Sequence, residues 1–326
     1  MSSVHLTVGS PTYAWSCYSM PRRSDSSGLR SPPSASLPTL LLDSYYRHQL
    51  VSTSSHRLSY FLAPSPPSPA PGAKVIVACR DMEKAQVAVK EIIEISGNDN
   101  VACMKLDLSN SKSIREFAEA INKDEPKLNL LINNAGVMVC PYGKTADGFE
   151  MQIGVNHFGH FLLTYLLIDL IKRSAPARIV TVSSMAHSWG SINLDDINSE
   201  KSYSKNKAYA QSKLANILFT RSLAKKLEGT GVTAYSLHPG VVQTDLWRHL
   251  SAPERFFIKI ASPFTKNSVQ GAQTTIYCAV EPSLEKESGG YYSDCAAASC
   301  SAAGKDDEVA QKLWELSCRM LSISWD

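Results

Sequence analysis

The sequence predicts an α/β domain with a doubly wound, Rossmann-like parallel sheet over residues 73–326, preceded by a disordered segment over residues 1–72. Two observations predict the sheet. Apolar strand-like runs alternate with helix-forming segments, and three of the runs end in small or polar residues. The third observation, a Ser- and Pro-rich composition up to residue 72, predicts the disorder.

The first segment has little that could order it. Residues 1–72 hold only two acidic residues, Asp25 and Asp43, and they finish in a Pro-rich run at 63–72. A segment without helical or alternating periodicity buries too little apolar surface to offset the entropy lost on folding. Its Arg- and Ser-rich, acid-poor character also permits an organellar transit peptide, although no amphipathic basic helix is visible.

From residue 73 onward, strands and helices alternate. Residues 74–79 are typical of a strand, and Asp81 is placed to cap the helix that follows. Ser109 is the expected cap of the next helix. The remaining expected elements are strands at 101–108, 128–132, 177–182 and 232–237, a helix at 149–171, a polar loop at 188–206 and an amphipathic helix that begins near Tyr209.

The helix near residue 209 carries the most informative pattern, Tyr209-Ala210-Gln211-Ser212-Lys213. Side chains four residues apart share one helix face, so Tyr209 and Lys213 can point into one pocket. A fixed cation lowers the pKa of a neighbouring phenol, which suits proton transfer at neutral pH. The pattern alone also fits a half-buried tyrosine beside a solvated lysine.

The other strand ends supply further motifs in a fixed order. They are Asn-Asn-Ala-Gly at 133–136, Ser-Ser at 183–184 and His-Pro-Gly-Val-Val-Gln-Thr-Asp-Leu at 238–246. Together with residues 209–213 they closely resemble the short-chain dehydrogenase/reductase family, within it the retinol dehydrogenase branch of the type numbered 11 to 14. The resemblance covers residues 72–326 and implies an oxidoreductase.

The resemblance assigns four residues to the reaction. Tyr209 is the expected general acid/base, and Lys213 is expected to lower its pKa and to bind the nicotinamide ribose. Ser184 would donate a hydrogen bond to the substrate oxygen. Asn156 would tether a water molecule beside the lysine, although a helix-surface amide is the plain alternative. Ser183 is the competing serine, more simply explained as a strand-end cap.

The resemblance also implies cofactor contacts, and Arg80 decides which cofactor is expected. An arginine just after this strand suits the 2′-phosphate of NADP, whereas an acid would favour NAD; a solvated arginine at a helix start is the alternative. Asp107 is expected near adenine, although it could instead cap a helix, and His238 fits strand-end packing better than catalysis. The other expected contacts are Asn133, Gly136, Pro239, Gly240, Val242 and Thr244.

One part of the family pattern is missing. The family begins with a strand and a TGxxxGxG turn whose following helix holds the cofactor pyrophosphate, and none of the seventeen glycines forms that motif. The absent strand is central, so its neighbours would be left with unpaired backbone groups. Residues 58–62 could fill the place in part, but the Pro-rich link at 64–73 is shorter than a parallel crossover needs.

Composition limits the other function classes. A net charge of +3 with 19% charged residues does not suggest a nucleic-acid partner. The eight cysteines form no zinc-type spacing, which predicts no metal and a reducing compartment. No apolar run reaches the roughly 20 residues of a membrane span, so we expect a cytoplasmic protein without an anchor. The family alternative is association with the endoplasmic reticulum membrane surface.

These observations favour an NADP-dependent oxidoreductase acting on a small lipophilic alcohol or aldehyde, retinol- or retinal-like by resemblance. Residues 247–264 suit either a lid over such a substrate or an ordinary packing helix. The alternative is a catalytically impaired relative, or a truncated gene product, that no longer binds dinucleotide.

Overall fold

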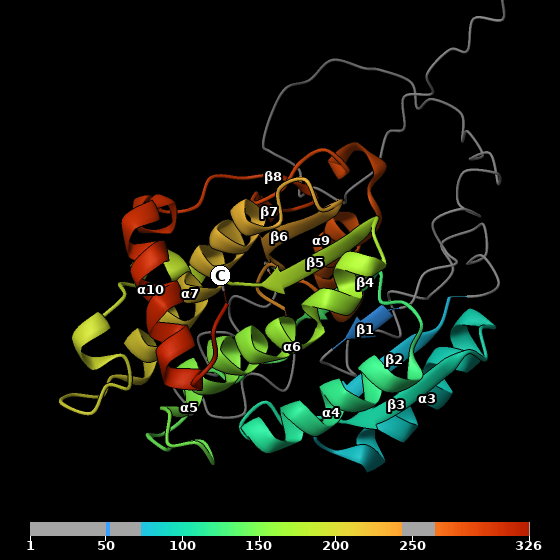
Figure 1. Cartoon of the computed structure of the whole chain (residues 1–326), viewed down its shortest axis with the longest axis horizontal. Helices are drawn as coiled ribbons and strands as arrows, with labels where there is room; N and C mark the ends of the chain where they lie inside the picture. Colours follow the sequence, from blue (N-terminus) through green and yellow to red (C-terminus); the bar gives the residue numbers. More distant parts are fainter. Residues whose placement is uncertain (1–49, 53–72, 243–264, 326) are drawn as a thin grey trace, which may run out of the picture.

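The computed structural model describes residues 50–52, 73–242 and 265–325, which build an eight-stranded sheet flanked by helices (Figure 1). The strand order is β3-β2-β1-β4-β5-β6-β7-β8. All neighbouring strands are parallel except β7 and β8. The order runs outward in both directions from β1, so the predicted doubly wound parallel sheet is confirmed.

The first half of the domain follows the predicted alternation. Its elements are β1 (Leu50–Ser52), β2 (Val75–Cys79), α3 (Met82–Ser96), β3 (Val101–Lys105), α4 (Ser111–Asp124) and β4 (Leu130–Asn133). The Asp81 carboxylate caps α3 by accepting from the Lys84 amide at 3.1 Å, as predicted. Helix α4 is capped by Asn110 rather than by Ser109, because the Asn110 side chain accepts from the first-turn amides.

The second half adds the remaining strands and the long helices. Its elements are α5 (Met151–Ile153), the π-helical turn η1 (Gly154–Phe158), α6 (Gly159–Arg173), β5 (Ala177–Val182), η2 (Met185–Trp189), η3 (Leu194–Asp196), α7 (Lys205–Lys226), β6 (Val232–His238), α9 (Ser268–Val280), η6 (Pro282–Leu284), β7 (Tyr291–Ser293), β8 (Ala296–Ala297), η7 (Ala302–Lys305) and α10 (Asp307–Leu321). Short 3-10 turns therefore interrupt the polar loop expected at 188–206.

Strand β1 takes the central place in the sheet, between β2 and β4. Val51 lies opposite Ile76 on one side and Leu131 on the other. Residues 58–62, which the sequence suggests for this place, lie outside the described residues. The link from β1 to β2 spans residues 53–74, longer than the dozen or so residues that a parallel crossover requires. A short strand from the Ser- and Pro-rich segment thus pairs with both neighbours that would otherwise lose their partner.

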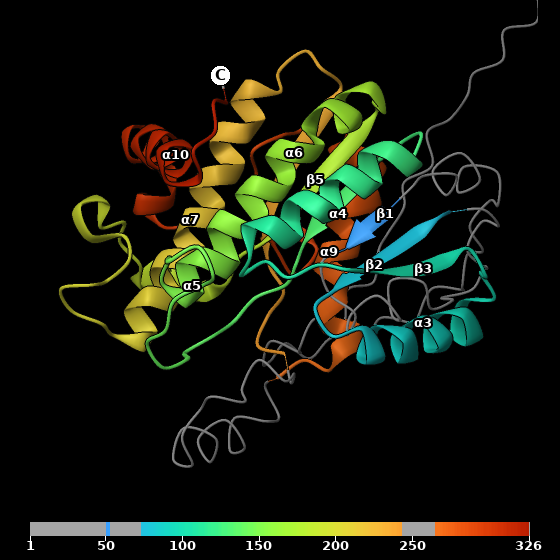
Figure 2. The ribbon, with the colours of Figure 1, turned by 60° about the horizontal axis from the view of Figure 1, so that its bottom comes forward.

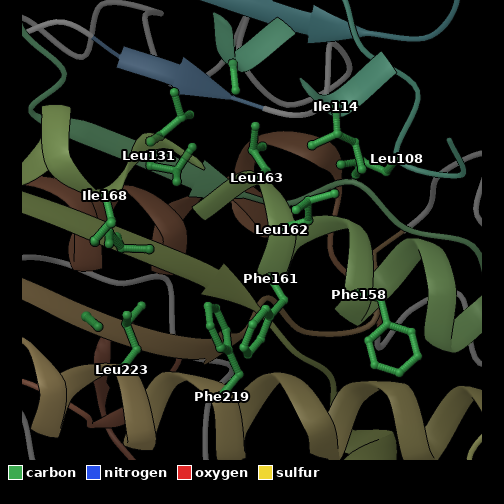
Figure 3. Close-up of a cluster of buried hydrophobic side chains, with 14 of the residues drawn as sticks. Leu108, Ile114, Leu131, Phe158, Phe161, Leu162, Leu163, Ile168, Phe219 and Leu223 are labelled. Atoms are coloured by element: carbon green, nitrogen blue, oxygen red, sulfur yellow. The ribbon is translucent and has the colours of Figure 1, made fainter. Parts of the chain in front are cut away.

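Two apolar layers cover the faces of the sheet. On one face, side chains of α4, α6, α7 and α10 form a cluster that includes Ile114, Leu163 and Phe219 (Figure 3). On the other face, Ile92 of α3 and Cys278 of α9 pack against Val77 and Val180 of the sheet. Figure 2 shows α3 and α6 on opposite sides of the strands. The sheet is therefore a buried middle layer, which explains its nearly continuous apolar strands.

Helix α7 is buried on both its apolar and its polar face, whereas an amphipathic helix exposes its polar face. Every residue from Ala208 to Thr220 is buried, because α10 covers the side of α7 that would otherwise face solvent. The contact includes Phe219 and Trp314, whose rings stack with centroids 5.9 Å apart. The predicted helix and the burial of its apolar stripe are correct, whereas the polar face expected to be exposed is buried as well. Polar side chains on α7 must consequently find partners inside the protein.

The helical run Met151–Arg173 is the one helix among residues 50–52, 73–242 and 265–325 that is long and apolar enough to cross a membrane. It is mostly buried within the domain. Its apolar character is accounted for by the cluster in Figure 3, to which Phe158, Phe161 and Leu163 contribute.

The central place of β1 predicts that Val51→Pro destabilises the fold. Proline removes a backbone donor from a strand paired on both sides, and an unsatisfied buried partner costs about 1–3 kcal/mol. We expect a lower midpoint in urea and in thermal unfolding. Val51→Thr, which keeps the amide and the β-branched shape, is the control. Equal midpoints for the two variants would show that β1 does not support the sheet.

Candidate active site

The candidate site lies at the carboxyl ends of β4, β5 and β6, where α7 passes close by. Tyr209 and Lys213 come from one face of α7, and the Lys213 Nζ lies 5.9 Å from the centre of the Tyr209 ring. Both side chains are buried. Burial of a lysine requires polar partners for its ammonium group, because an uncompensated buried charge is costly.

Backbone carbonyl and serine contacts hold the lysine. The Lys213 Nζ donates to the Val182 carbonyl at the end of β5, at 3.0 Å. The Ser183 hydroxyl donates to the Lys213 carbonyl at 2.7 Å, so that hydroxyl is engaged with α7. These two bonds fasten the end of β5 to the helix that carries Tyr209.

Ser184 is placed differently from its neighbour. It is half-buried and caps the short turn η2, where its Oγ accepts from the Ala186 amide at 3.2 Å. A serine hydroxyl can accept one bond and still donate another. Of the two adjacent serines, Ser184 is therefore the one whose hydroxyl proton is not committed to a protein acceptor within the described residues.

Asn156 lies in η1, where the chain from α5 to α6 widens into a π-helical turn. Such turns frequently occur at functional sites. Its amide donates to the Val137 carbonyl and to the Ser212 hydroxyl, both at 2.9 Å, and its Oδ1 accepts from the Val137 amide at 2.8 Å. Asn156 is fully buried, so it is not the helix-surface amide of the alternative interpretation.

Gly136 lets the loop after β4 approach this asparagine. A Cβ built on Gly136 would lie 3.0 Å from Asn156 Oδ1 and 3.6 Å from Lys213 Nζ. Three residues before Gly136, the Asn133 side-chain amide donates to the Thr164 hydroxyl at 3.1 Å, which ties the end of β4 to α6. The Asn-Asn-Ala-Gly motif thus packs directly against the Asn156 and Lys213 side chains.

Two fully buried histidines, His157 and His160, follow Asn156 in the chain, and they were not among the residues predicted from the sequence. Burial lowers the pKa of His157 to about 3 and the pKa of His160 to about 4, so both are neutral at physiological pH. The His160 Nδ1 lies 3.0 Å from the Asn156 carbonyl oxygen. Two histidines inside an otherwise apolar helical run are the sequence signal that could have revealed them.

The residues expected at the adenine end of the cofactor lie at the ends of β2 and β3. Arg80 directly follows β2, and its side chain is exposed. Asp107 closes the turn after β3 by accepting from the Ser109 amide at 2.9 Å and from the Ser109 hydroxyl at 2.6 Å. Since Asn110 caps α4, the alternative role of Asp107 as that helix cap is wrong.

The loop after β6 is described only as far as Val242. Pro239 and Val242 are buried, and Gly240 has a φ of +90°, a conformation that favours glycine. The His238 Nδ1 accepts from the Met185 amide at 3.2 Å. Thr244 and the possible lid at 247–264 lie outside the described residues.

Neither a metal centre nor a disulfide emerges from the part of the chain that the structure describes. No group of three or more His, Cys, Asp or Glu side chains in residues 50–52, 73–242 and 265–325 could hold a metal ion. The seven cysteines in these ranges are free thiols. The four predicted site residues stay a prediction: Lys213 bonds the end of β5, Asn156 bonds the residue before Lys213, and Ser184 begins the turn that follows β5.

Comparisons with known proteins agree with this architecture. The short chain dehydrogenase family profile matches residues 69–255. Human retinol dehydrogenase 12 is 53% identical over 255 residues, which cover 78% of this chain and 80% of that protein. A crystal structure of an uncharacterized protein from Mycobacterium paratuberculosis is 33% identical with a TM-score of 0.68, covering 87% of this chain and 97% of that one.

A more distant structure shares the fold. The gluconate 5-dehydrogenase from Burkholderia cenocepacia, solved with NADP and tartrate, is 19% identical with a TM-score of 0.58. The similarity covers 77% of this chain and 95% of that one.

The close approach at Gly136 predicts that Gly136→Ala is destabilising. The added methyl group would press on Asn156 Oδ1, and overpacking of this kind typically costs about 1–3 kcal/mol. Gly143→Ala is the matched control, since a Cβ there meets nothing within 4 Å. In thermal unfolding Gly136→Ala should melt at a lower temperature than Gly143→Ala. Equal melting temperatures would mean that the loop at Gly136 shifts to accommodate the methyl group.

The buried histidines predict acid sensitivity. Their folded pKa values lie below the ordinary value of 6.5, so the unfolded chain binds more protons as the pH falls from about 6.5 to about 4. Stability should drop in that window by about 1.4 kcal/mol per pH unit for each histidine. Urea unfolding at several pH values tests this, with a shallower slope expected for His157→Gln. An unchanged slope would contradict it.

Proposed function

The chain belongs to the short-chain dehydrogenase/reductase family, in its retinol dehydrogenase branch, and we propose that it transfers hydride between NADP(H) and a hydrophobic alcohol or aldehyde. Oxidoreductase chemistry with a nicotinamide dinucleotide is the family's activity. The observation that supports the proposal is that Lys213 Nζ, 5.9 Å from the centre of the Tyr209 ring, bonds the Val182 carbonyl, two residues before Ser184.

In this proposal Tyr209 moves the proton. Its hydroxyl would give a proton to the substrate oxygen during reduction and take one during oxidation. The buried Lys213 ammonium, 5.9 Å from the Tyr209 ring, favours the phenolate and would also bond the nicotinamide ribose. Ser184, whose Oγ accepts from the Ala186 amide, would donate its hydroxyl proton to the same substrate oxygen. Bound NADP(H) supplies or accepts the hydride.

In this proposal Asn156 supports Tyr209 and Lys213. It is held by Val137 and by Ser212, the residue next to Lys213 in α7, so it is rigidly placed beside the lysine. A water molecule bound there would give Lys213 a route for proton exchange. Its complete burial and its side-chain hydrogen bonds to Val137 and Ser212 favour positioning over direct contact with substrate.

Arg80 is the basis for NADP over NAD. Its exposed guanidinium at the end of β2 is free of a described ion pair and has the fork geometry that binds phosphate. Gly136, whose missing Cβ lets the loop after β4 lie against Asn156 and Lys213, is proposed as a contact of the cofactor ribose. The further contacts proposed for the cofactor are Asp107, Asn133, Pro239, Gly240, Val242 and Thr244.

The surroundings of Ser184 support a lipophilic substrate. Met185 directly follows it and Trp189 ends the same turn η2, and these side chains expose 48% and 75% of their surface. Large apolar side chains beside a reacting hydroxyl favour a substrate with little polar surface. A retinoid-like alcohol or aldehyde is consistent with this chemistry and with the named activity of the relatives.

We further propose that residues 73–326 form the enzyme domain, with 50–52 supplying its central strand. A cytoplasmic location is the simplest proposal, and attachment to the endoplasmic reticulum surface is the alternative. Neither location requires the Met151–Arg173 helix to cross a membrane, and that helix is mostly buried in the core.

A second candidate function follows from the sequence between β1 and β2. A dinucleotide pyrophosphate is normally bound by backbone amides of a glycine-rich turn at a helix N-terminus. Residues 53–72 contain one glycine, Gly72, and no TGxxxGxG. Hydrogen bonds to charged groups contribute about 1.5–3 kcal/mol each, so losing two or three would weaken binding by orders of magnitude. The alternative is therefore a chain with an intact proton-transfer site and impaired dinucleotide binding.

The proposal predicts that Tyr209→Phe loses turnover while NADPH affinity stays nearly unchanged. General acid–base catalysis contributes at least about a hundredfold, so kcat should fall by that factor or more. Tyr165→Phe is the control, because it makes the same change in a tyrosine of α6 whose ring packs against Trp325. Retained activity in Tyr209→Phe, measured with a hydrophobic aldehyde and NADPH, would remove Tyr209 from the mechanism.

Cofactor choice should depend on Arg80. Arg80→Asp replaces a charge-assisted contact to the 2′-phosphate by repulsion, so the ratio of kcat/KM for NADPH over NADH should fall at least about tenfold. Arg115→Asp makes the same charge change at an exposed position of α4 and should leave the ratio unchanged. An unaltered ratio in the Arg80 variant would mean that another group binds the phosphate.

A further inference from the structure

The carbonyl that holds Lys213 has a second donor. Val182 O accepts from Lys213 Nζ at 3.0 Å and also from Asn216 Nδ2 at 3.2 Å. Asn216 lies one turn beyond Lys213 in α7 and is fully buried. A carbonyl oxygen has two lone pairs, so these two donors occupy both of them. The lysine is thereby limited to one side of the carbonyl.

Asn216 meets a buried histidine from the neighbouring helical run. Asn216 Oδ1 and His157 Nδ1 are both buried atoms with no hydrogen-bond partner of good geometry. Burial lowers the pKa of His157, a repulsion from His160 lowers it further, and hydrogen bonding by the Asn216 side chain opposes them. The asparagine side chain is therefore close enough to interact with the histidine ring, and each of the two side chains has one buried polar atom without a partner.

The opposite side of the ring is bonded to α10. His157 Nε2 lies 3.0 Å from Ser317 Oγ, and that hydroxyl also lies 2.7 Å from the Leu313 carbonyl. Ser317 is fully buried, and α10 packs along α7 (Figure 1). A polar path thus leads from the C-terminal helix through His157 and Asn216 to the carbonyl that holds Lys213.

Hydrogen-bond accounting decides where the ring proton lies. If His157 carried its proton on Nε2, the lone pair of Nδ1 would face the lone pairs of Asn216 Oδ1, and two buried acceptors would stay unsatisfied. A proton on Nδ1 lets the ring donate to Oδ1. The Ser317 hydroxyl can then turn from Leu313 to donate to Nε2, so that each ring nitrogen has a partner.

We propose that Asn216 is a positioning residue for Lys213, and that His157, as the Nδ1–H tautomer, and Ser317 hold Asn216 in place. The chain Ser317–His157–Asn216–Val182–Lys213 rests on the proposed function of Lys213 as the partner of Tyr209. It links helix α10, which contributes nothing to the reacting groups, to the ammonium that tunes the tyrosine. The two remaining protons of Nζ are thereby directed away from β5, toward Tyr209 and the nicotinamide ribose.

The histidine tautomer provides a test that requires no turnover. Full-length protein with 15N-labelled histidine would be examined by long-range 1H–15N correlation, with the His157 signal assigned by its loss in His157→Gln. We expect the Nδ1–H tautomer in the wild type and the Nε2–H tautomer in Asn216→Leu, which removes the acceptor. An Nε2–H tautomer at His157 in the wild type would overturn the proposed chain, whatever tautomer Asn216→Leu shows.

The consequence for the site is measured on Tyr209 itself. With 13Cζ-labelled tyrosine, the Tyr209 signal is assigned by its loss in Tyr209→Phe and titrated. Asn216→Leu should raise the Tyr209 pKa by about 0.5–1 unit, because the lysine is no longer confined. Thr220→Val is the matched control: Thr220 lies one turn further along α7, is equally buried, and its hydroxyl donates only to the Asn216 backbone carbonyl, at 2.9 Å.

The outcomes separate this inference from the proposed function. A Tyr209 pKa below its ordinary value in the wild type and in Asn216→Leu alike would overturn the positioning role alone. A Tyr209 pKa that is not lowered in the wild type would overturn the action of Lys213 on Tyr209, and with it both proposals. An equal shift in Thr220→Val would assign the effect to general loosening of α7 and overturn the specific role of Asn216.

Discussion

Backbone pairing at the middle of the sheet is the constraint on which the rest of the structure depends. Strands β2 and β4 both pair with β1, so three residues satisfy the facing backbone groups of two buried strands. The same pairing aligns the carboxyl ends of the strands, which places Asn133 on β4 next to Thr181 on β5. The position of Ser184, just beyond β5, and of Gly136, just beyond β4, follows from that alignment.

The site built on this frame has two unequal halves. At the β4–β5–α7 end, Lys213 and Ser183 join the end of β5 to α7, and Asn156 joins the loop after β4 to Ser212 of α7. At the other end, the segment that follows β1 has none of the glycines that let a backbone approach a pyrophosphate. The residues proposed for proton transfer are thus supported independently of the segment that would hold the phosphates.

Much of this arrangement could be predicted from sequence because it has a local cause. The Asp81 cap and the apolar strands ending near Asn133, Val182 and His238 each depend on a few neighbouring residues. Strand β1 could not be predicted, since a three-residue strand has no periodicity and is defined only by its two neighbours. The burial of α7 and the contact of His157 with Ser317, 160 residues apart, depend equally on long-range packing.

The central claim is that the chain retains a proton-transfer site whose dinucleotide affinity is limited by the missing glycine-rich turn. The most direct measurement is a fluorescence titration with NADPH of two proteins, the chain itself and a chimera in which a strand–TGxxxGxG–helix unit replaces residues 1–72. The account predicts micromolar binding for the chimera and binding weaker by orders of magnitude for the unmodified chain. Micromolar binding by the unmodified chain would contradict it, and would show that residues 1–72 supply a phosphate site of their own.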